Sequence, residues 1–197
     1  MTERIMGPAR LEAFSDGVIA ILITIMVLEL KVPVGHEPAA LIGLWPTFLS
    51  YLLSFLVIAI YWVNHHGLFH LCKYVNNAVL WSNMAFLLCI SLIPFATAYM
   101  GENRFTPFAT ALYGATLLLA GLSFVPMRHA VERQLDGDPA YRAIGRRTAI
   151  KNYVSVALYA ASVPLAFVRP AITLILAFTV SAIYFLPNAW LGEHTRR

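Results

Sequence analysis

An aspartate inside the first apolar run is the side chain of this sequence best placed to do chemistry. Asp16 and Glu29 enclose too few uncharged residues for a membrane-spanning helix, which needs about 20, so a helix here can cross a bilayer only with Asp16 inside it. A carboxylate at membrane depth costs about 2.5–3.5 kcal/mol or more, and such residues usually have a function. We therefore expect Asp16 to be buried and to accept hydrogen bonds.

The composition indicates the kind of protein that positions this carboxylate. Of 197 residues, 59% are hydrophobic and 12% are charged, a balance typical of integral membrane proteins. We predict an all-α fold, a six-helix membrane bundle that forms a single domain over residues 1–197 and keeps its first segment after synthesis. The six apolar segments cover residues 13–32, 44–64, 79–99, 108–125, 153–168 and 171–190.

The basic residues predict the orientation of these segments. With six crossings, Lys31, Arg104 and Arg169 lie on one side, and the other eleven of the fourteen lysines and arginines lie on the side of both termini. The positive-inside rule places both termini in the cytoplasm of a multi-pass cell-membrane protein. A basic cytoplasmic hairpin is expected at about residues 127–152, around a DGDP turn signal. The net charge of +4 then reflects topology and contact with membrane lipid, and nucleic acid is not an expected partner.

One face of the first segment combines bulky aliphatic side chains with a hydroxyl. At 100° per residue, Ile21, Ile25 and Leu28 fall on one stripe, and Thr24 borders it. Periodicity alone favours packing of this stripe against neighbouring helices. Apolar residues surround the segment on every side, so the pattern does not identify the face that such packing would use.

The run RLEAFSDGVIAI at residues 10–21 resembles the signature of the Transmembrane protein 175 potassium channel family, in which it opens the first helix of each six-helix repeat. Trp62-x-x-His65 at the end of the second segment and Asn83 in the third are also similar to the family pattern. The resemblance covers essentially the whole chain, although the last three segments match only in hydropathy and length.

The resemblance implies a potassium-preferring channel that conducts passively, is not an enzyme and needs no cofactor. The first helices of a homotetramer would surround a central pore. Ile21 would form the main hydrophobic constriction, Ile25 and Leu28 would add aliphatic rings, and Thr24 would place hydroxyl oxygens near a permeant potassium ion. Aliphatic rings can close a pore by expelling water, whereas hydroxyls replace part of the water shell of an ion.

The resemblance also implies a structural polar network that holds the first helix to the second and third. Its members are Arg10, Phe14, Ser15, Asp16, Trp62, His65 and Asn83. Ser15 and Asp16 would face away from the pore, with Asp16 accepting from an indole, an imidazole and an amide. Arg10 would either contact the Phe14 ring or reach lipid phosphates.

One other function, a coupled transporter, remains open at this point. A proton- or cation-coupled secondary transporter would use Asp16 and His65 as a relay, but it predicts an internal repeat that the sequence lacks. His66 and His70 share a helical face, yet no cysteine or carboxylate at fixed spacing completes a shell, so we expect no structural metal. Because imidazole titrates near neutral pH, we also advance the hypothesis that His65 makes gating respond to pH.

Overall fold

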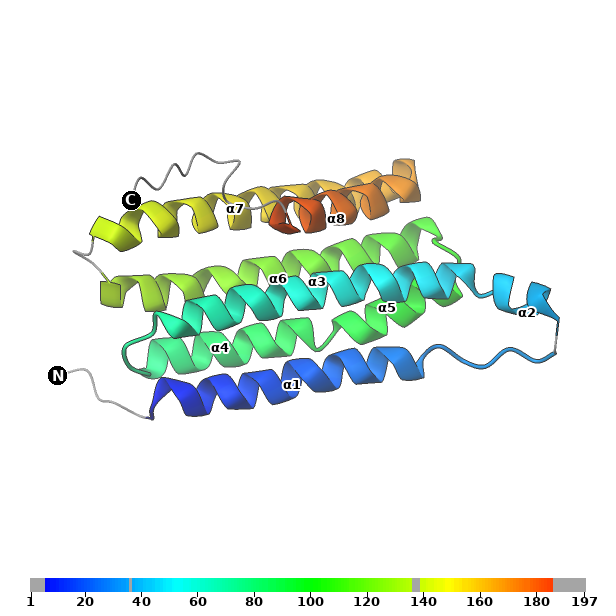
Figure 1. The fold of residues 1–197 in the computed structure, drawn as a ribbon. Coiled ribbons are helices and arrows are strands. Elements are labelled where there is room, and N and C mark those ends of the chain that lie inside the picture. Colours follow the sequence, from blue (N-terminus) through cyan, green and yellow to red (C-terminus); the bar gives the residue numbers. More distant parts are fainter. Residues whose placement is uncertain (1–5, 36, 136–138, 186–197) are drawn as a thin grey trace, which may run out of the picture.

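The computed structural model describes residues 6–35, 37–135 and 139–185, and the side chains of 139–144, 146 and 147 are left out of the description. The described residues fold into helices joined by short connections (Figure 1). In chain order these are α1 (Pro8–Leu28), α2 (Pro38–Ile42), α3 (Trp45–His70), α4 (Asn77–Ile90), α5 (Ile93–Glu102), α6 (Pro107–Glu132), the 3-10 turn η1 (Arg133–Leu135), α7 (Pro139–Val168) and α8 (Pro170–Phe185). The prediction of an all-α fold is confirmed.

Proline and asparagine residues start several of these helices. Proline occupies the first or second position of α1, α2, α3, α5 and α6, where its missing N–H costs nothing. Asn76 caps α4 by accepting a hydrogen bond from the Val79 amide at 3.0 Å. The third predicted segment is divided into α4 and α5 at Ser91–Leu92, just before Pro94, whose ring cannot continue a regular helix.

The helix ends differ from the bounds of the apolar segments that predicted them. The first helix begins at Pro8 rather than at residue 13 and ends at Leu28 rather than at 32, and α3 continues to His70. Hydropathy detects only the apolar part of a helix, so polar turns at its ends escape such a prediction. The predicted turn at 136–138 and the last five residues of the sixth segment, 186–190, lie outside the described residues.

Four helical segments of the described chain are long and apolar enough to cross a membrane. They are Pro8–Leu28, Trp45–His70, Asn77–Glu102 and Pro107–Leu135, and Pro170–Phe185 is a shorter apolar helix. This set identifies a multi-pass membrane protein.

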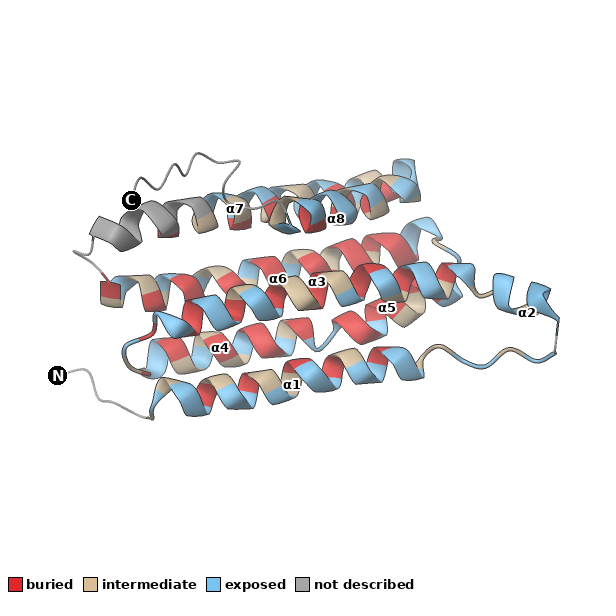
Figure 2. Ribbon diagram, viewed as in Figure 1, coloured by how far each residue is buried: buried red, intermediate tan, exposed pale blue. Residues whose placement is uncertain are grey.

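The helices form a bundle with α1 at one side and α7 and α8 at the other (Figure 1). The first helix packs against α3, α4 and α5, whereas α7 packs against α6 and α8. Buried residues concentrate on the inner helices, and α1 carries a long exposed face (Figure 2). Aromatic rings fill the middle: the Phe86 ring lies 5.5 Å from that of Tyr61 and 5.3 Å from that of Phe124.

Candidate functional site

The first helix has two distinct faces. Its buried residues recur every three or four positions and are Leu11, Ser15, Ile19, Leu22 and Met26. The predicted stripe lies on the other face: Ile21 is 57% exposed, Ile25 is 40% exposed and Leu28 is 77% exposed. Thr24 is also exposed. The stripe therefore does not pack against the chain's own helices, and it offers a continuous aliphatic surface to whatever surrounds the single chain.

Thr24 interrupts this aliphatic surface with an oriented hydroxyl. Its Oγ1 donates to the carbonyl oxygen of Ile21 at 2.8 Å. A hydroxyl whose proton is held by the backbone can still accept, because both oxygen lone pairs remain free. The exposed face of α1 thus presents an oxygen acceptor that suits a cation.

On the buried face, a short polar chain joins α1 to α4 and α3. Asn83 Nδ2 donates to Ser15 Oγ at 3.0 Å, and Asn83 Oδ1 accepts from His65 Nε2 at 2.8 Å. All three side chains are fully buried, and Ser15 Oγ also donates to the Leu11 carbonyl. A buried hydrogen-bonded chain of this kind favours one arrangement of its helices, because breaking either link leaves a buried polar group without its partner.

The imidazole of His65 is held from both sides as well as by its hydrogen bond. Its ring stacks on Phe69 at 4.4 Å between centroids and faces Phe86 at 5.9 Å. Among the described residues, His65 Nδ1 has no hydrogen-bond partner. The side chain serves as a packed donor to Asn83 in this arrangement.

The predicted surroundings of Asp16 need correction. Its Oδ1 accepts from Trp62 Nε1 at 2.9 Å, as expected. The imidazole of His65 and the amide of Asn83 were also expected there, but His65 donates to Asn83 and Asn83 donates to Ser15. Asp16 is half-buried rather than enclosed, because it lies between the buried and exposed faces of α1. Within the single chain, its carboxylate keeps an exposed side.

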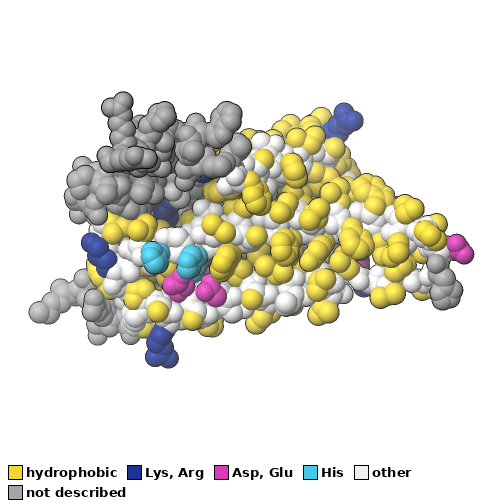
Figure 3. Space-filling model, viewed as in Figure 1, with side chains coloured by type: hydrophobic (Ala, Val, Ile, Leu, Met, Phe, Trp, Pro, Cys, Tyr) yellow, Lys and Arg dark blue, Asp and Glu magenta, His cyan; other side chains and the backbone are white. Residues whose placement is uncertain are grey.

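A second pair of interacting side chains lies next to Asp16 and Trp62 and was missed by the sequence analysis. Glu12 Oε1 lies 2.8 Å from His66 Nδ1, one helical turn from the Asp16–Trp62 pair on both helices. The Trp62 and His66 rings are stacked at 5.8 Å, and histidine and acidic side chains lie together on the face shown in Figure 3. The two four-residue spacings, 12 to 16 and 62 to 66, are a signal that could have revealed this two-rung ladder between antiparallel helices.

The outer members of the predicted network are not joined to it. Arg10 and Phe14 are both exposed, and the cation–π contacts among the described residues are those of Arg128 with Tyr153 and Lys151 with Tyr184. The described part of the chain contains no group of three or more His, Cys, Asp or Glu side chains arranged for a metal.

Comparison with known proteins gives a consistent result. The family described as "Endosomal/lysosomal potassium channel TMEM175" matches residues 10–94. A potassium channel of Chryseobacterium sp. (strain P1-3) is 38% identical over 183 residues, which cover 93% of this chain and 95% of the relative. A potassium channel of Streptomyces collinus is 36% identical over 191 residues, with 89% and 90% covered.

A solved structure agrees with these sequence matches. The crystal structure of a lysosomal potassium-selective channel TMEM175 homolog from Chamaesiphon minutus superimposes with a TM-score of 0.68 at 32% identity, covering 91% of this chain and 98% of that one. The matched residues 10–94 contain the exposed stripe, the Ser15–Asn83–His65 chain and the ladder. The chain belongs to the TMEM175 potassium channel family.

Proposed function

We propose that this protein is a potassium-preferring cation channel that conducts passively through a central pore lined by α1. The observation that carries the proposal is the exposed face of α1, where Ile21, Ile25 and Leu28 stand free beside the Thr24 hydroxyl. One helix cannot enclose a pathway, so the pore needs several copies. A homotetramer with the four α1 helices at its axis would provide it.

In this arrangement the exposed stripe supplies both a gate and an ion site. Ile21 forms the main constriction, with Ile25 and Leu28 as further rings, because a narrow ring of aliphatic side chains excludes water and ions. Four Thr24 oxygens replace part of the hydration shell of potassium. Their protons are directed to the Ile21 carbonyls, which leaves the lone pairs for the ion.

The anchor of α1 fits the same proposal. The Ser15–Asn83–His65 chain and the Asp16–Trp62 bond lie away from the stripe and hold α1 to α3 and α4. They would keep four aliphatic faces directed at the axis. Six crossings with both termini in the cytoplasm follow if α7 and α8 span as a hairpin beside the four longer segments, and the distribution of basic residues supports that orientation.

The alternative of a coupled transporter has less support. Asp16 and His65 hydrogen-bond to different partners, Trp62 and Asn83, so they do not form one continuous relay. The names of the bacterial relatives also describe channels.

Reconstitution in planar bilayers tests the proposal. With potassium and sodium on opposite sides, we expect single-channel currents that reverse near the potassium equilibrium potential. Saturable flux that needs a second solute would contradict the proposal.

Substitution of the constriction tests the pore lining itself. Ile21→Asn should increase conductance, because a polar ring no longer expels water. The matched control is Ile175→Asn on α8, at a side chain that is 62% exposed on the opposite side of the bundle. Equal conductance changes in the two variants, or none in Ile21→Asn channels that assemble normally, would place the pore elsewhere.

A further inference from the structure

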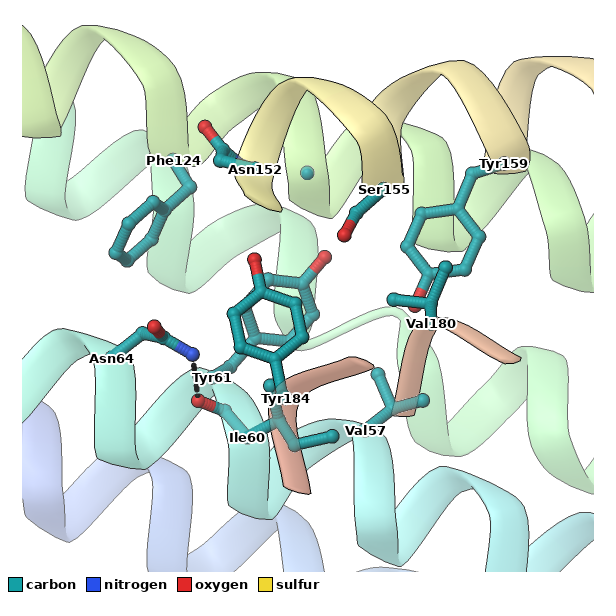
Figure 4. A pocket seen from close by; sticks show the side chains of 11 residues that line it. Val57, Ile60, Tyr61, Asn64, Phe124, Asn152, Ser155, Tyr159, Val180 and Tyr184 are labelled. Atoms are coloured by element: carbon teal, nitrogen blue, oxygen red, sulfur yellow. Dashed lines mark hydrogen bonds between the residues drawn. The ribbon is translucent and has the colours of Figure 1, made fainter. Parts of the chain in front are cut away.

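A second polar region lies in the half of the bundle that holds α7 and α8, away from the exposed face of α1. It surrounds a cavity of about 20 Å³ between α3, α6, α7 and α8. Figure 4 shows the hydroxyls of Tyr61, Tyr184 and Ser155 gathered near its middle. In a bundle that is otherwise apolar, so many polar atoms require hydrogen-bond partners.

Arg128 on α6 does not line this cavity, but it lies one helical turn beyond Phe124, which does, and its guanidinium needs the most hydrogen-bond partners in this part of the bundle. It is only 2% exposed, and its Nη1 donates to Glu132 Oε1 at 2.9 Å. Its Nε and Nη2 have no hydrogen-bond partner among the described residues. A buried guanidinium with two unsatisfied nitrogens is costly, so the native protein should supply an acceptor.

Asn152 on α7 has an acceptor without a donor, whereas Arg128 has donors without an acceptor. It is 5% exposed, and within the described chain its Oδ1 accepts no hydrogen bond. The guanidinium carbon of Arg128 lies 5.1 Å from the ring centroid of Tyr153, the next residue, which brings the two unsatisfied groups to the same α6–α7 contact. The Asn152 oxygen points away from the three hydroxyls, on the side of Phe124, which lies one turn of α6 before Arg128 (Figure 4).

We propose that an ordered water molecule binds at the α6–α7 contact, beyond the Asn152 end of this cavity, and bridges Arg128 to Asn152. Its oxygen accepts from Nε and Nη2 of Arg128, and one of its hydrogens is donated to Asn152 Oδ1. A buried water needs two to four polar partners, and Nε and Nη2 of Arg128 together with Oδ1 of Asn152 supply three. The bridge ties the α7–α8 pair to α6.

The charges around the site favour water over an anion. Glu132 already places a carboxylate against Arg128, and an anion would also meet the Asn152 oxygen. Water can accept from the arginine and donate to the amide at once, which a halide cannot do.

A high-resolution structure of the assembled channel in nanodiscs tests the ligand directly. With KCl, and again with KBr, we expect one oxygen-sized peak within hydrogen-bonding distance of Arg128 and Asn152 Oδ1, and no anomalous bromide signal there. Bromide at the site, or direct contact between Asn152 Oδ1 and the guanidinium without a peak, would overturn the proposal.

Melting temperatures of the assembled channel test the coupling. Arg128→Met and Asn152→Leu should each lower the melting temperature by several degrees, and the double variant should lose less than their sum. Asn64→Leu is the matched control, because Asn64 lines the same cavity but donates to the Ile60 carbonyl of its own helix. Strictly additive losses for Arg128 and Asn152 would contradict a bridge.

An aspartate substitution keeps the acceptor at the same position. Because aspartate has the same reach as asparagine, a carboxylate oxygen in Asn152→Asp can accept from the same water, so the melting temperature and the water peak should both be retained. A loss as large as that of Asn152→Leu would mean that no partner of Arg128 is reachable from position 152. Channel conductance should be the same in all of these variants, because none of them contacts α1.

Discussion

The first and sixth helices have almost the same apolar character but opposite surroundings. Mean hydropathy is 2.1 for α1 and 1.8 for the segment that contains α6, yet 28% of the most apolar stretch of α1 and 56% of that of α6 are buried. Hydropathy therefore indicates that a helix can enter a membrane, without indicating which of its faces the chain covers. The α6 helix is covered by other helices of its own chain, whereas one face of α1 is free for contacts beyond its own chain.

The two helices are also held in different ways. On α6, neighbouring side chains pack directly against a glycine: a Cβ added at Gly114 would lie 2.6 Å from Ser162 Oγ. On α1, a Cβ added at Gly17 would meet no atom within 4 Å. With one face uncovered, α1 depends on directional hydrogen bonds to Asn83 and Trp62 for its position.

The largest effect is expected when this polar anchor is broken. Asn83→Leu leaves Ser15 Oγ and His65 Nε2 buried without their partner, at a cost of about 2–4 kcal/mol. We expect a marked loss of assembled channel, measured by size-exclusion chromatography of the extracted protein. Asn103→Leu is the control, because the exposed Asn103 side chain donates to the carbonyl of Tyr99, four residues earlier on its own helix. If both variants assemble equally well, the buried chain does not anchor α1.

A matched pair of glycine substitutions tests the packing contrast. Gly114→Ala should destabilise the protein by about 1–3 kcal/mol, because the added methyl group collides with Ser162. Gly17→Ala should leave the fold intact, since space is open there and alanine favours a helix. Thermal unfolding followed by fluorescence measures both changes. Equal losses would mean that Gly17 is also closely covered, which would remove the contrast.

Hydroxyl removal should change ion preference on one helix only. Thr24→Val should reduce discrimination of potassium from sodium by about 3–10-fold, equivalent to roughly 1 kcal/mol. Thr116→Val on α6 deletes a hydroxyl that likewise donates to its own helix, at the Leu112 carbonyl, but on a buried side chain. Its reversal potential should match that of the parent channel. A parent-like reversal potential in Thr24→Val would remove Thr24 from the ion pathway.

The smallest effect is expected at the exposed pair that lies just beyond the end of α1. Lys31 Nζ lies 2.7 Å from Glu102 Oε1 with both side chains in solvent, so Lys31→Gln should change the melting temperature only slightly. The hydrogen bond and charge of Glu102 raise the pKa of Lys31 above 10.5. The contribution of the pair is thus fully present below that pH and is lost as the pH rises through the raised pKa. A melting difference that varies between pH 6 and pH 9 would point to another group.

Much of the fold could be predicted from hydropathy, but the contacts between helices could not. Asp16 was expected to accept from an indole, and Trp62 does donate to it. The expected imidazole and amide bond elsewhere: His65 donates to Asn83, and Asn83 donates to Ser15. Adjacent positions 15 and 16 differ by 100° around the helix, so a small difference in rotation decides which of them meets α4. Sequence spacing alone does not fix that rotation.

The buried Arg128 was also beyond prediction. In the sequence it resembles the other basic residues of the expected cytoplasmic hairpin, and its burial depends on how α7 lies across α6. Glu12 and His66, by contrast, were predictable in principle, because each lies one turn from a residue already paired.

The two-rung ladder between α1 and α3 has a mechanical consequence. Its rungs are one turn apart on both helices, so α1 can neither roll about its long axis nor slide without breaking both. Rotation of α1 by the angle of one residue, 100°, would move Ile21 by more than a quarter of a turn about the helix axis. The ladder therefore opposes rotation of α1, and while both rungs are intact, a pathway along this helix could widen by tilting of α1 or by rotamer changes of Ile21.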